Sequence, residues 1–432
     1  MNVGIISLGC AKNRVDSEEV LSYFYRNGFQ IVSSQADADI LVVNTCGFIE
    51  AAKKEAIDTI FDTLKYHKIT VVIGCLVERY YEELKKEIPE VDLFVPIKDY
   101  SKFGDLLSEV IKNKEFRGSI VKTERIYSTP SYQAYLQISD GCDNFCSFCA
   151  IPLIRGRFHS FDFEMLKGEI RKIAENGVKE IIVISQDTSS YGKDLTGKNL
   201  TICSILKEIL KYPSFEFIRL LYLYPDEVTD EFIELYKNNS RLTPYFDIPI
   251  QHSEDHILKS MHRHGDKAQM VKLFDKIKSE IPNAVIRTTL IVGFPGETRE
   301  DISALKDFIV KESFDHLGVF KYSPEEGTVG YMMKDQILER EKSYRYNQIM
   351  KCQSGISFKN NQKHLGEVVS AIITGYDEKT FAYSGLCYIF APDDIDGDLY
   401  IYSKDKELQI GETVKAKIVN AGIYDLDAEV VE

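Results

Sequence analysis

The sequence predicts an α/β protein built from an open, mostly parallel α/β sheet, a partial (β/α) barrel and a small all-β barrel. Three observations support this. The 432 residues, of which 44% are hydrophobic, exceed one compact domain and suffice for two or three cores. Short β-rich runs alternate with amphipathic stretches over most of the chain. Beyond residue 365, short β-rich runs follow one another, separated by Gly and Asp.

The N-terminal unit spans residues 1–126. Its apolar runs have the length of buried strands and are separated by amphipathic segments, which predicts a parallel sheet with helical connections. The expected strands are residues 3–8, 40–44, 71–74 and 93–97. Turn-forming residues at 127–131 mark the first boundary.

The central unit spans residues 132–358, where the same alternation restarts with longer repeats. Six β/α units predict a partial barrel, and barrels of this kind carry their chemistry at the carboxyl ends of the strands. The expected strands lie near 134–139, 179–185, 217–224, 246–251, 285–292 and 316–322. A helix from Leu338 to about Ser354 and a polar run at 359–363 end the unit.

The C-terminal unit spans residues 365–432 and is predicted to be the small all-β barrel. Its β-rich runs are residues 368–373, 382–389, 399–403 and 413–419. The unit holds 14 Asp or Glu against five Lys or Arg, a net charge of −9. Such a surface repels phosphates and attracts basic proteins, unless it serves only solubility.

Composition and charge argue against a secreted, membrane-spanning or nonspecific nucleic-acid-binding protein. The N-terminus lacks the features of a secretory signal, and no apolar run approaches the roughly 18 residues of a membrane span. We therefore expect a cytoplasmic protein with no membrane partner. Nine cysteines in such a chain indicate metal or redox chemistry rather than disulfides. The net charge of −14 disfavours nonspecific binding to nucleic acid.

Three cysteines form a C-x3-C-x2-C motif just beyond the first predicted barrel strand, on the chemical face. They are Cys142, Cys146 and Cys149. Thiolates are the protein ligands of iron-sulfur clusters, and three of them leave one iron of a [4Fe-4S] cluster open. The alternatives are zinc with a fourth ligand elsewhere, or simple packing.

Three further cysteines, Cys10, Cys46 and Cys75, are distant in sequence, but each follows a predicted parallel strand of the N-terminal sheet. The carboxyl ends of such strands converge on one crevice, and the flanking glycines permit close approach of a bulky group. We infer a second three-cysteine cluster site. Buried, merely apolar cysteines are the alternative.

The motif at Cys142 resembles that of radical S-adenosylmethionine enzymes, and the whole chain resembles the methylthiotransferase family. That family combines a cluster-bearing N-terminal domain, a radical barrel and a C-terminal, OB-like TRAM domain. The resemblance implies two [4Fe-4S] clusters, S-adenosyl-L-methionine as radical source and methyl donor, a reductase and a sulfur donor. Each cysteine triplet is then one cluster's ligand set.

Family members modify either a tRNA adenosine or an aspartate of ribosomal protein S twelve. The segments at 7–18 and at 151–156 resemble the ribosomal-protein branch. The expected reaction is insertion of a methylthio group at the β-carbon of an aspartyl residue, which needs a carbon radical because the position is unactivated. A tRNA methylthiotransferase and a non-catalytic iron-sulfur carrier are the alternatives.

Weaker signals concern S-adenosylmethionine. Gln186 ends the second barrel strand, Gln251 follows the fourth, and Gly293 belongs to a loop that resembles an adenine-contacting loop of radical enzymes. Arg287, on the fifth strand, is expected either to pair with the cofactor carboxylate or to form a structural salt bridge. Arg155 and Arg157, beyond the cysteine motif, are candidate contacts for a substrate aspartate.

Overall fold

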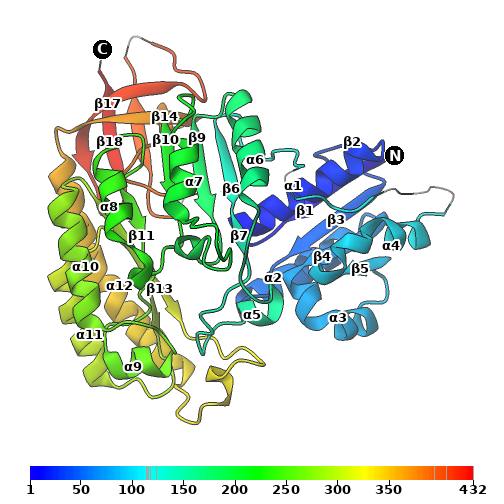
Figure 1. Ribbon diagram of the computed structural model, residues 1–432, viewed down its shortest axis with the longest axis horizontal. Helices are drawn as coiled ribbons and strands as arrows, with labels where there is room; N and C mark the ends of the chain where they lie inside the picture. Colours follow the sequence, from blue (N-terminus) through cyan, green and yellow to red (C-terminus); the bar gives the residue numbers. More distant parts are fainter. Residues whose placement is uncertain (113–115, 117, 123, 394, 405, 432) are drawn as a thin grey trace.

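The structure is a computed structural model that describes residues 1–432 except 113–115, 117, 123, 394, 405 and 432. Figure 1 shows the N-terminal sheet, the central strands with their outer helices, and a compact β-structure formed by the last residues. No helix in the described ranges is long and apolar enough to span a bilayer.

The N-terminal sheet is parallel and has the order β2-β1-β3-β4-β5. Its strands are β1 (Asn2–Ser7), β2 (Gln30–Ile31), β3 (Ile40–Thr45), β4 (Ile69–Gly74) and β5 (Leu93–Val95). The helical elements are α1 (Ala11–Arg26), α2 (Glu50–Leu64), α3 (Cys75–Glu87), η1 (Ile97–Lys102) and α4 (Phe103–Val110). The sheet contains the four predicted strands, and β2 adds a short exposed edge that the hydrophobic pattern did not reveal.

The central unit is a partial barrel of six parallel strands in two hydrogen-bonded sheets, β10-β9-β6 and β11-β12-β13. An isolated bridge between Ile218 and Leu242 joins the two sheets. The strands are β6 (Gln133–Gln137), β9 (Glu180–Ile184), β10 (Phe217–Leu220), β11 (Tyr245–Asp247), β12 (Val285–Val292) and β13 (His316–Lys321). All six coincide with predicted strands.

Helices surround this barrel, and a small ribbon follows its first strand (Figure 1). The ribbon pairs β7 (Ser139–Asp140) with β8 (His159–Ser160). The helices are α5 (Ile151–Ile154), α6 (Phe163–Glu175), α7 (Ile202–Ile209), α8 (Asp230–Lys237), α9 (Asp255–Ser260), α10 (Lys267–Glu280), α11 (Arg299–Glu312) and α12 (Glu339–Asn361), with short 3-10 turns η2 (Thr188–Ser190), η3 (Pro225–Glu227) and η4 (Gly330–Met332).

The C-terminal unit is a closed barrel with the order β14-β15-β16-β18-β17. Its strands are β14 (Val368–Asp377), β15 (Ala382–Leu386), β16 (Leu399–Tyr402), β17 (Thr413–Ala421) and β18 (Leu426–Val430). The sequence did not single out β18. The predicted fold class, with its open sheet, partial barrel and small all-β barrel, is confirmed.

Helix α12 is longer than predicted and leads directly to the C-terminal barrel through η5 (Gln362–His364). The Asn361 side chain donates to the carbonyls of Gly422 and Ile423, and the Gln362 side chain donates to that of Ala421. The polar run that looked like a linker is therefore helical, because its amides satisfy carbonyls of the adjoining barrel.

The first helix of the N-terminal unit packs into the open side of the central barrel. Ala11 and Val15 of α1 share one apolar cluster with Tyr135 of β6, Ile182 of β9 and Tyr245 of β11. Figure 1 shows the start of α1 beside β6. This packing brings the carboxyl ends of the N-terminal strands to the barrel interior, where the candidate site lies.

Candidate active site between two cysteine triplets

The N-terminal triplet sits where three parallel strands end. Cys10 caps α1 after β1, Cys46 follows β3, and Cys75 begins α3 directly after β4. The loops approach so closely that only glycine fits between them. A Cβ on Gly9, whose φ is +89°, would lie 2.8 Å from Cβ of Cys46, and such a contact is not tolerated. The structure thus brings Cys10 and Cys46 together, as the sheet topology predicted.

Burial shapes the chemistry of these thiols. It raises the pKa of the Cys75 thiol to about 12, against the opposing effect of the nearby Arg155 guanidinium. Burial also raises the pKa of Cys46. Sγ of Cys75 lies 3.4 Å from Oδ1 of Asn13 and donates a hydrogen bond to it. Without a metal, these two thiols are protonated near neutral pH, so cluster binding must release protons.

The second triplet lies on the loop between β7 and α5, at the carboxyl end of the barrel strands. The loop is held by backbone bonds, since the amide of Cys142 donates to Gly156 and that of Cys149 to Cys146. Gly141, with φ +74°, is required there because a Cβ would lie 2.1 Å from the carbonyl oxygen of Arg157. Burial raises the pKa of Cys142 to about 11.

The two triplets meet across the short helix α5. Cys75 packs against Ala150 and Ile154 in one small apolar cluster, and Ala150 directly follows Cys149. Hence the N-terminal triplet and the barrel triplet lie on either side of a single helical turn. Two redox groups held here would be neighbours.

Arg155, at the end of α5, joins the two triplets electrostatically. Its side chain is 2% exposed, and its Nη2 lies 2.6 Å from Oδ2 of Asp16 and 3.5 Å from Sγ of Cys75. Its Nη1 lies 3.5 Å from Oδ2 of Asp140, two residues before Cys142. The sequence suggested that Arg155 meets a substrate. The structure instead places it in a buried network that is already occupied.

A second arginine, which the sequence did not single out, lies beside the barrel triplet. Nη1 of Arg263 is 3.9 Å from Sγ of Cys146, and its guanidinium lies 3.8 Å from the ring centroid of Tyr224. The Cys146 contact joins positions 117 residues apart, so no local motif could have revealed it. Each triplet therefore has one adjacent guanidinium.

The donor set fits iron-sulfur clusters. A cubane cluster gives each thiolate its own iron, so three thiolates around one cluster leave the fourth iron open. Three soft thiols on a glycine-bearing loop, with a guanidinium nearby, match a cluster better than an isolated ion.

The residues predicted to hold S-adenosylmethionine take different positions. Gln186 donates from Nε2 to Oδ1 of Asp140 at 2.9 Å, beside the barrel triplet. Its Oε1 is buried and has no hydrogen-bond partner among the described residues, and Oε1 of Gln137 shares this condition. Unpaired buried acceptors are costly, so both fit a polar ligand that donates hydrogen bonds.

Gln251, with φ 70°, follows β11 and bridges to Leu290 of β12. Gly293 follows β12 with φ +76°, and a Cβ there would lie 2.4 Å from Cγ of Lys342. Gly293 thus packs against Lys342 of α12, and its amide donates to Oε1 of Glu297 at 2.9 Å. Its role toward the cofactor stays a prediction, as does that of Gln251.

Arg287 faces the barrel interior from the amino-terminal half of β12. Its Nη1 lies 2.9 Å from Oδ1 of Asp247, and its Nε lies 3.1 Å from Oδ1 of Asp396 in the C-terminal barrel. Of the two possibilities that the sequence left open, the structural salt bridge is present. The guanidinium links the two barrels.

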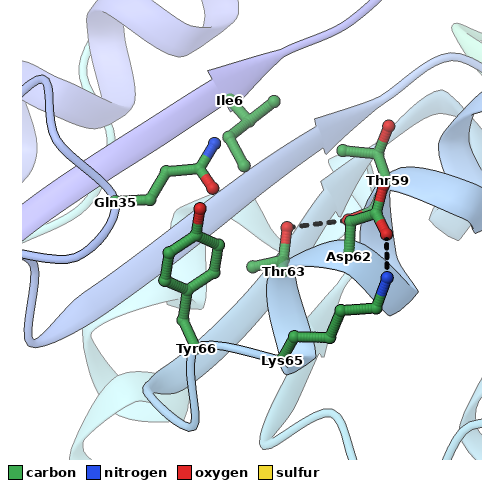
Figure 2. Close-up of a pocket in the computed structure, with 7 residues that line it drawn as sticks. All are labelled: Ile6, Gln35, Thr59, Asp62, Thr63, Lys65 and Tyr66. Atoms are coloured by element: carbon green, nitrogen blue, oxygen red, sulfur yellow. Dashed lines mark hydrogen bonds and ion pairs between the residues drawn. The ribbon is translucent and has the colours of Figure 1, made fainter.

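A hollow of about 460 Å³ on the N-terminal sheet is unrelated to these groups. Figure 2 shows its lining, in which Thr63 donates to Thr59 and Lys65 pairs with Asp62 at the end of α2. None of the six cysteines lines it. The candidate site therefore rests on the convergence of the two triplets.

Comparisons with known proteins agree with this arrangement. Residues 2–96 match the uncharacterized protein family UPF0004, residues 136–309 the radical SAM superfamily, and residues 365–431 the TRAM domain. The chain is 44% identical to the ribosomal protein uS12 methylthiotransferase RimO of Thermoanaerobacter sp. (strain X514), over 99% of both chains. The chain belongs to the uS12 methylthiotransferase family. The Aquifex aeolicus member is also 44% identical, over 99% of this chain and 96% of its own.

Membership makes the chain a radical S-adenosylmethionine enzyme of the methylthiotransferase class, with S-adenosylmethionine and a [4Fe-4S] cluster as cofactors. A solved structure of the radical S-adenosylmethionine methyltransferase TsrM from Kitasatospora setae has a TM-score of 0.55 and 14% identity to this family member. The match covers 76% of this chain and 77% of TsrM. At that identity, the likeness concerns the fold.

Proposed function

We propose that this protein inserts a methylthio group at the β-carbon of an aspartyl residue of ribosomal protein uS12. In this proposal Cys142, Cys146 and Cys149 hold the cluster that acts on S-adenosylmethionine. Cys10, Cys46 and Cys75 hold a second [4Fe-4S] cluster, which carries the sulfur. A reductase and a sulfur donor must supply electrons and sulfur, and a ribosomal substrate makes the cytoplasm the expected location.

One observation carries the proposal. Cys75 packs against Ala150, the residue after Cys149, so a cysteine of the N-terminal triplet lies beside the start of α5, where the barrel triplet ends. An electron carrier does not need a second cluster site beside the first one at the barrel interior. An enzyme that joins carbon to sulfur does need the two sites close together, because the radical carbon and the sulfur must come within bonding distance.

When bound, the clusters and S-adenosylmethionine supply the 5'-deoxyadenosyl radical, the sulfur and the methyl group. The chain's own residues bind and orient. Gln186 and Gln137 offer acceptor oxygens that no described residue pairs with, near the barrel triplet. Arg155 and Arg263 place positive charge at Cys75 and Cys146, respectively. Helix α1 closes the open side of the barrel with Ala11 and Val15, which excludes water.

The charge of the C-terminal barrel supports a basic protein substrate. Its net charge of −9 favours association with a cationic partner and opposes binding to tRNA phosphates. Part of this charge is used internally, since Asp396 pairs with Arg287 and Asp393 with Arg14. Glu412 and Glu429 also pair with lysines of the unit, so the net excess of carboxylates, rather than any single free one, supports a cationic partner.

The test is mass spectrometry of uS12 after incubation with anaerobically reconstituted enzyme, S-adenosylmethionine, a reductant and sulfide. We expect a mass gain corresponding to one methylthio group, and 5'-deoxyadenosine in the small-molecule fraction. The Cys146→Ala variant should give neither product, whereas Cys203→Ala, a buried core cysteine of α7, should give both.

The outcomes separate the alternatives. Unchanged uS12 together with a modified tRNA adenosine would favour the tRNA branch. Absence of 5'-deoxyadenosine from wild-type enzyme with full iron content would favour an electron carrier. Binding to tRNA with a steep salt dependence would also contradict the protein substrate.

A further inference from the structure

Lys12 is a buried lysine at the first turn of α1, two residues after Cys10. The residue is only 8% exposed. Its Nζ lies 3.4 Å from the ring centroid of Tyr222, at the end of β10 in the central barrel. Within the part of the chain that the structure describes, this ring is the one partner recorded for the Lys12 ammonium.

The ring of Tyr222 is a fixed platform. Tyr222 has φ 64°, a conformation that a bulky residue adopts only when its surroundings impose it. Its amide donates to Oδ2 of Asp247 at 3.0 Å, and its carbonyl accepts from the amide of Thr188 at 3.0 Å. These bonds hold the ring beneath the ammonium and so fix the ammonium in place.

The carboxylates near the Tyr222 ring, Asp247 and Asp396, already form ion pairs with an arginine. Oδ1 of Asp247 and Oδ1 of Asp396 both pair with Arg287, at 2.9 and 3.1 Å. A cation over an aromatic face is stabilised only in part, whereas removing an ammonium from water is costly unless an anion compensates. Lys12 is therefore a site prepared for an anion that comes from outside the described chain.

The amino-terminal end of α1 adds to the positive electrostatic potential around Lys12. Helix α1 has no acidic residue in its first turn and no side chain that caps it. Its positive dipole end therefore adds to the charge of Lys12. Because Ala11 and Val15 pack against barrel residues while Cys10 is exposed, this helix end lies beside the barrel strands and can be reached from outside.

We propose that Lys12 binds the side-chain carboxylate of the substrate aspartyl residue and thereby selects aspartate. This inference rests on the proposed function. A carboxylate held by Lys12 places its β-carbon one carbon-carbon bond away from the anchored group, beside Cys10 and within the barrel. The residue is a specificity determinant: it positions the carbon that loses hydrogen and gains sulfur.

The test measures affinity rather than turnover. Purified holoenzyme is titrated with uS12 and with a uS12 variant that carries Asn in place of the modified aspartate. Wild-type enzyme should bind the Asp form about 10- to 100-fold more tightly, the range of a charge-assisted contact. In Lys12→Met this ratio should fall to about one, and Lys12→Arg should restore part of it.

Lys54→Met, which removes an exposed lysine of α2, is the matched control and should keep the wild-type ratio. A Lys12→Met enzyme that retains the ratio while the wild type modifies uS12 overturns the inference alone. Loss of cluster iron in Lys12→Met also overturns it, because the ammonium then serves the thiolates. A wild-type enzyme that neither binds nor modifies uS12 overturns the proposed function as well.

Discussion

Nη2 of Arg155 lies 3.5 Å from Sγ of Cys75, although 80 residues separate the two positions. This contact crosses from the radical barrel to the N-terminal sheet. The same guanidinium pairs with Asp16 on one side and Asp140 on the other. One side chain thus connects the surroundings of both cysteine triplets.

Arg155→Met should destabilise the protein and lower the reduction potential of the proposed second cluster. The change removes the buried guanidinium from Asp16 and Asp140, which keep only Lys122 and Gln186 as side-chain partners, and this costs about 3 kcal/mol in the free energy of unfolding. It also removes a positive charge that favours the more negative, reduced cluster. Thermal unfolding and a potentiometric EPR titration measure the two effects. Arg155→Lys keeps the charge, so its potential should stay nearer the wild type.

Cys75→Ser should distinguish the roles of the two proposed clusters, because it should remove one and leave the other. We expect the reconstituted variant to lose about half of its iron, because each triplet is proposed to hold four irons. It should still form 5'-deoxyadenosine, yet no longer methylthiolate uS12. Iron analysis and product assays check this. Equal iron in Cys75→Ser and wild type would mean that the N-terminal triplet holds no cluster.

Gln186→Leu should weaken binding of S-adenosylmethionine about tenfold, as expected when a buried polar contact to a ligand is lost. Oε1 of Gln186 is buried and has no hydrogen-bond partner in the part of the chain that the structure describes, while its Nε2 donates to Asp140. Equilibrium binding to the anaerobic holoenzyme measures the effect. Gln362→Leu, whose amide contacts only the C-terminal barrel in the described structure, is the control. Equal affinities for both variants would remove Gln186 from the cofactor site.

Gly293→Ala should unfold at a lower temperature than Gly296→Ala. Both glycines have positive φ, +76° and +83°, so both variants bear the backbone cost of about 1 kcal/mol. Only at position 293 does the new methyl group also meet a side chain, Cγ of Lys342 at 2.4 Å. Calorimetry of the two variants isolates this clash, and equal melting temperatures would show that Lys342 moves aside freely.

Because Glu19 is buried, its ionisation should lower the free energy of unfolding as pH rises from about 4.5 to about 7. Burial raises the pKa of this carboxyl to about 7, with Lys122 opposing and Asp16 reinforcing the shift. In this pH window the unfolded state has lost the proton that the folded state keeps, so the free energy of unfolding falls with pH. Glu19→Gln should flatten that decline, and Glu83→Gln on the exposed face of α3 should not. Urea unfolding at pH 5 and pH 8 measures both.

The cysteine positions could be predicted because they depend on local signals. Cys10, Cys46 and Cys75 each end a run with strand character, and parallel strand ends share one edge. The helix end near Ser354 was predicted too early, because Asn360 is polar yet buried. Its side chain donates to the carbonyl of Ser313 at 3.0 Å. Such tertiary bonds leave no periodic signal in the sequence.

The arginine contacts could not be predicted for the same reason. Arg263 reaches Cys146 from 117 positions away, and Arg287 finds Asp396 across two domains. Each of these contacts forms only when segments distant in the sequence have packed together. Strand β18 has an alternating pattern, Leu426 to Val430, but it is short and comes at the end of an acidic stretch.

The insertion of α1 into the central barrel also bears on how the chain matures. The inner faces of β9 and β11 contribute Ile182, Ile184 and Tyr245 to an apolar cluster that α1 and the C-terminal loop at Ala391 complete. A nascent central barrel without these neighbours would expose those apolar side chains to water and be prone to aggregation. We therefore expect the three units to fold cooperatively.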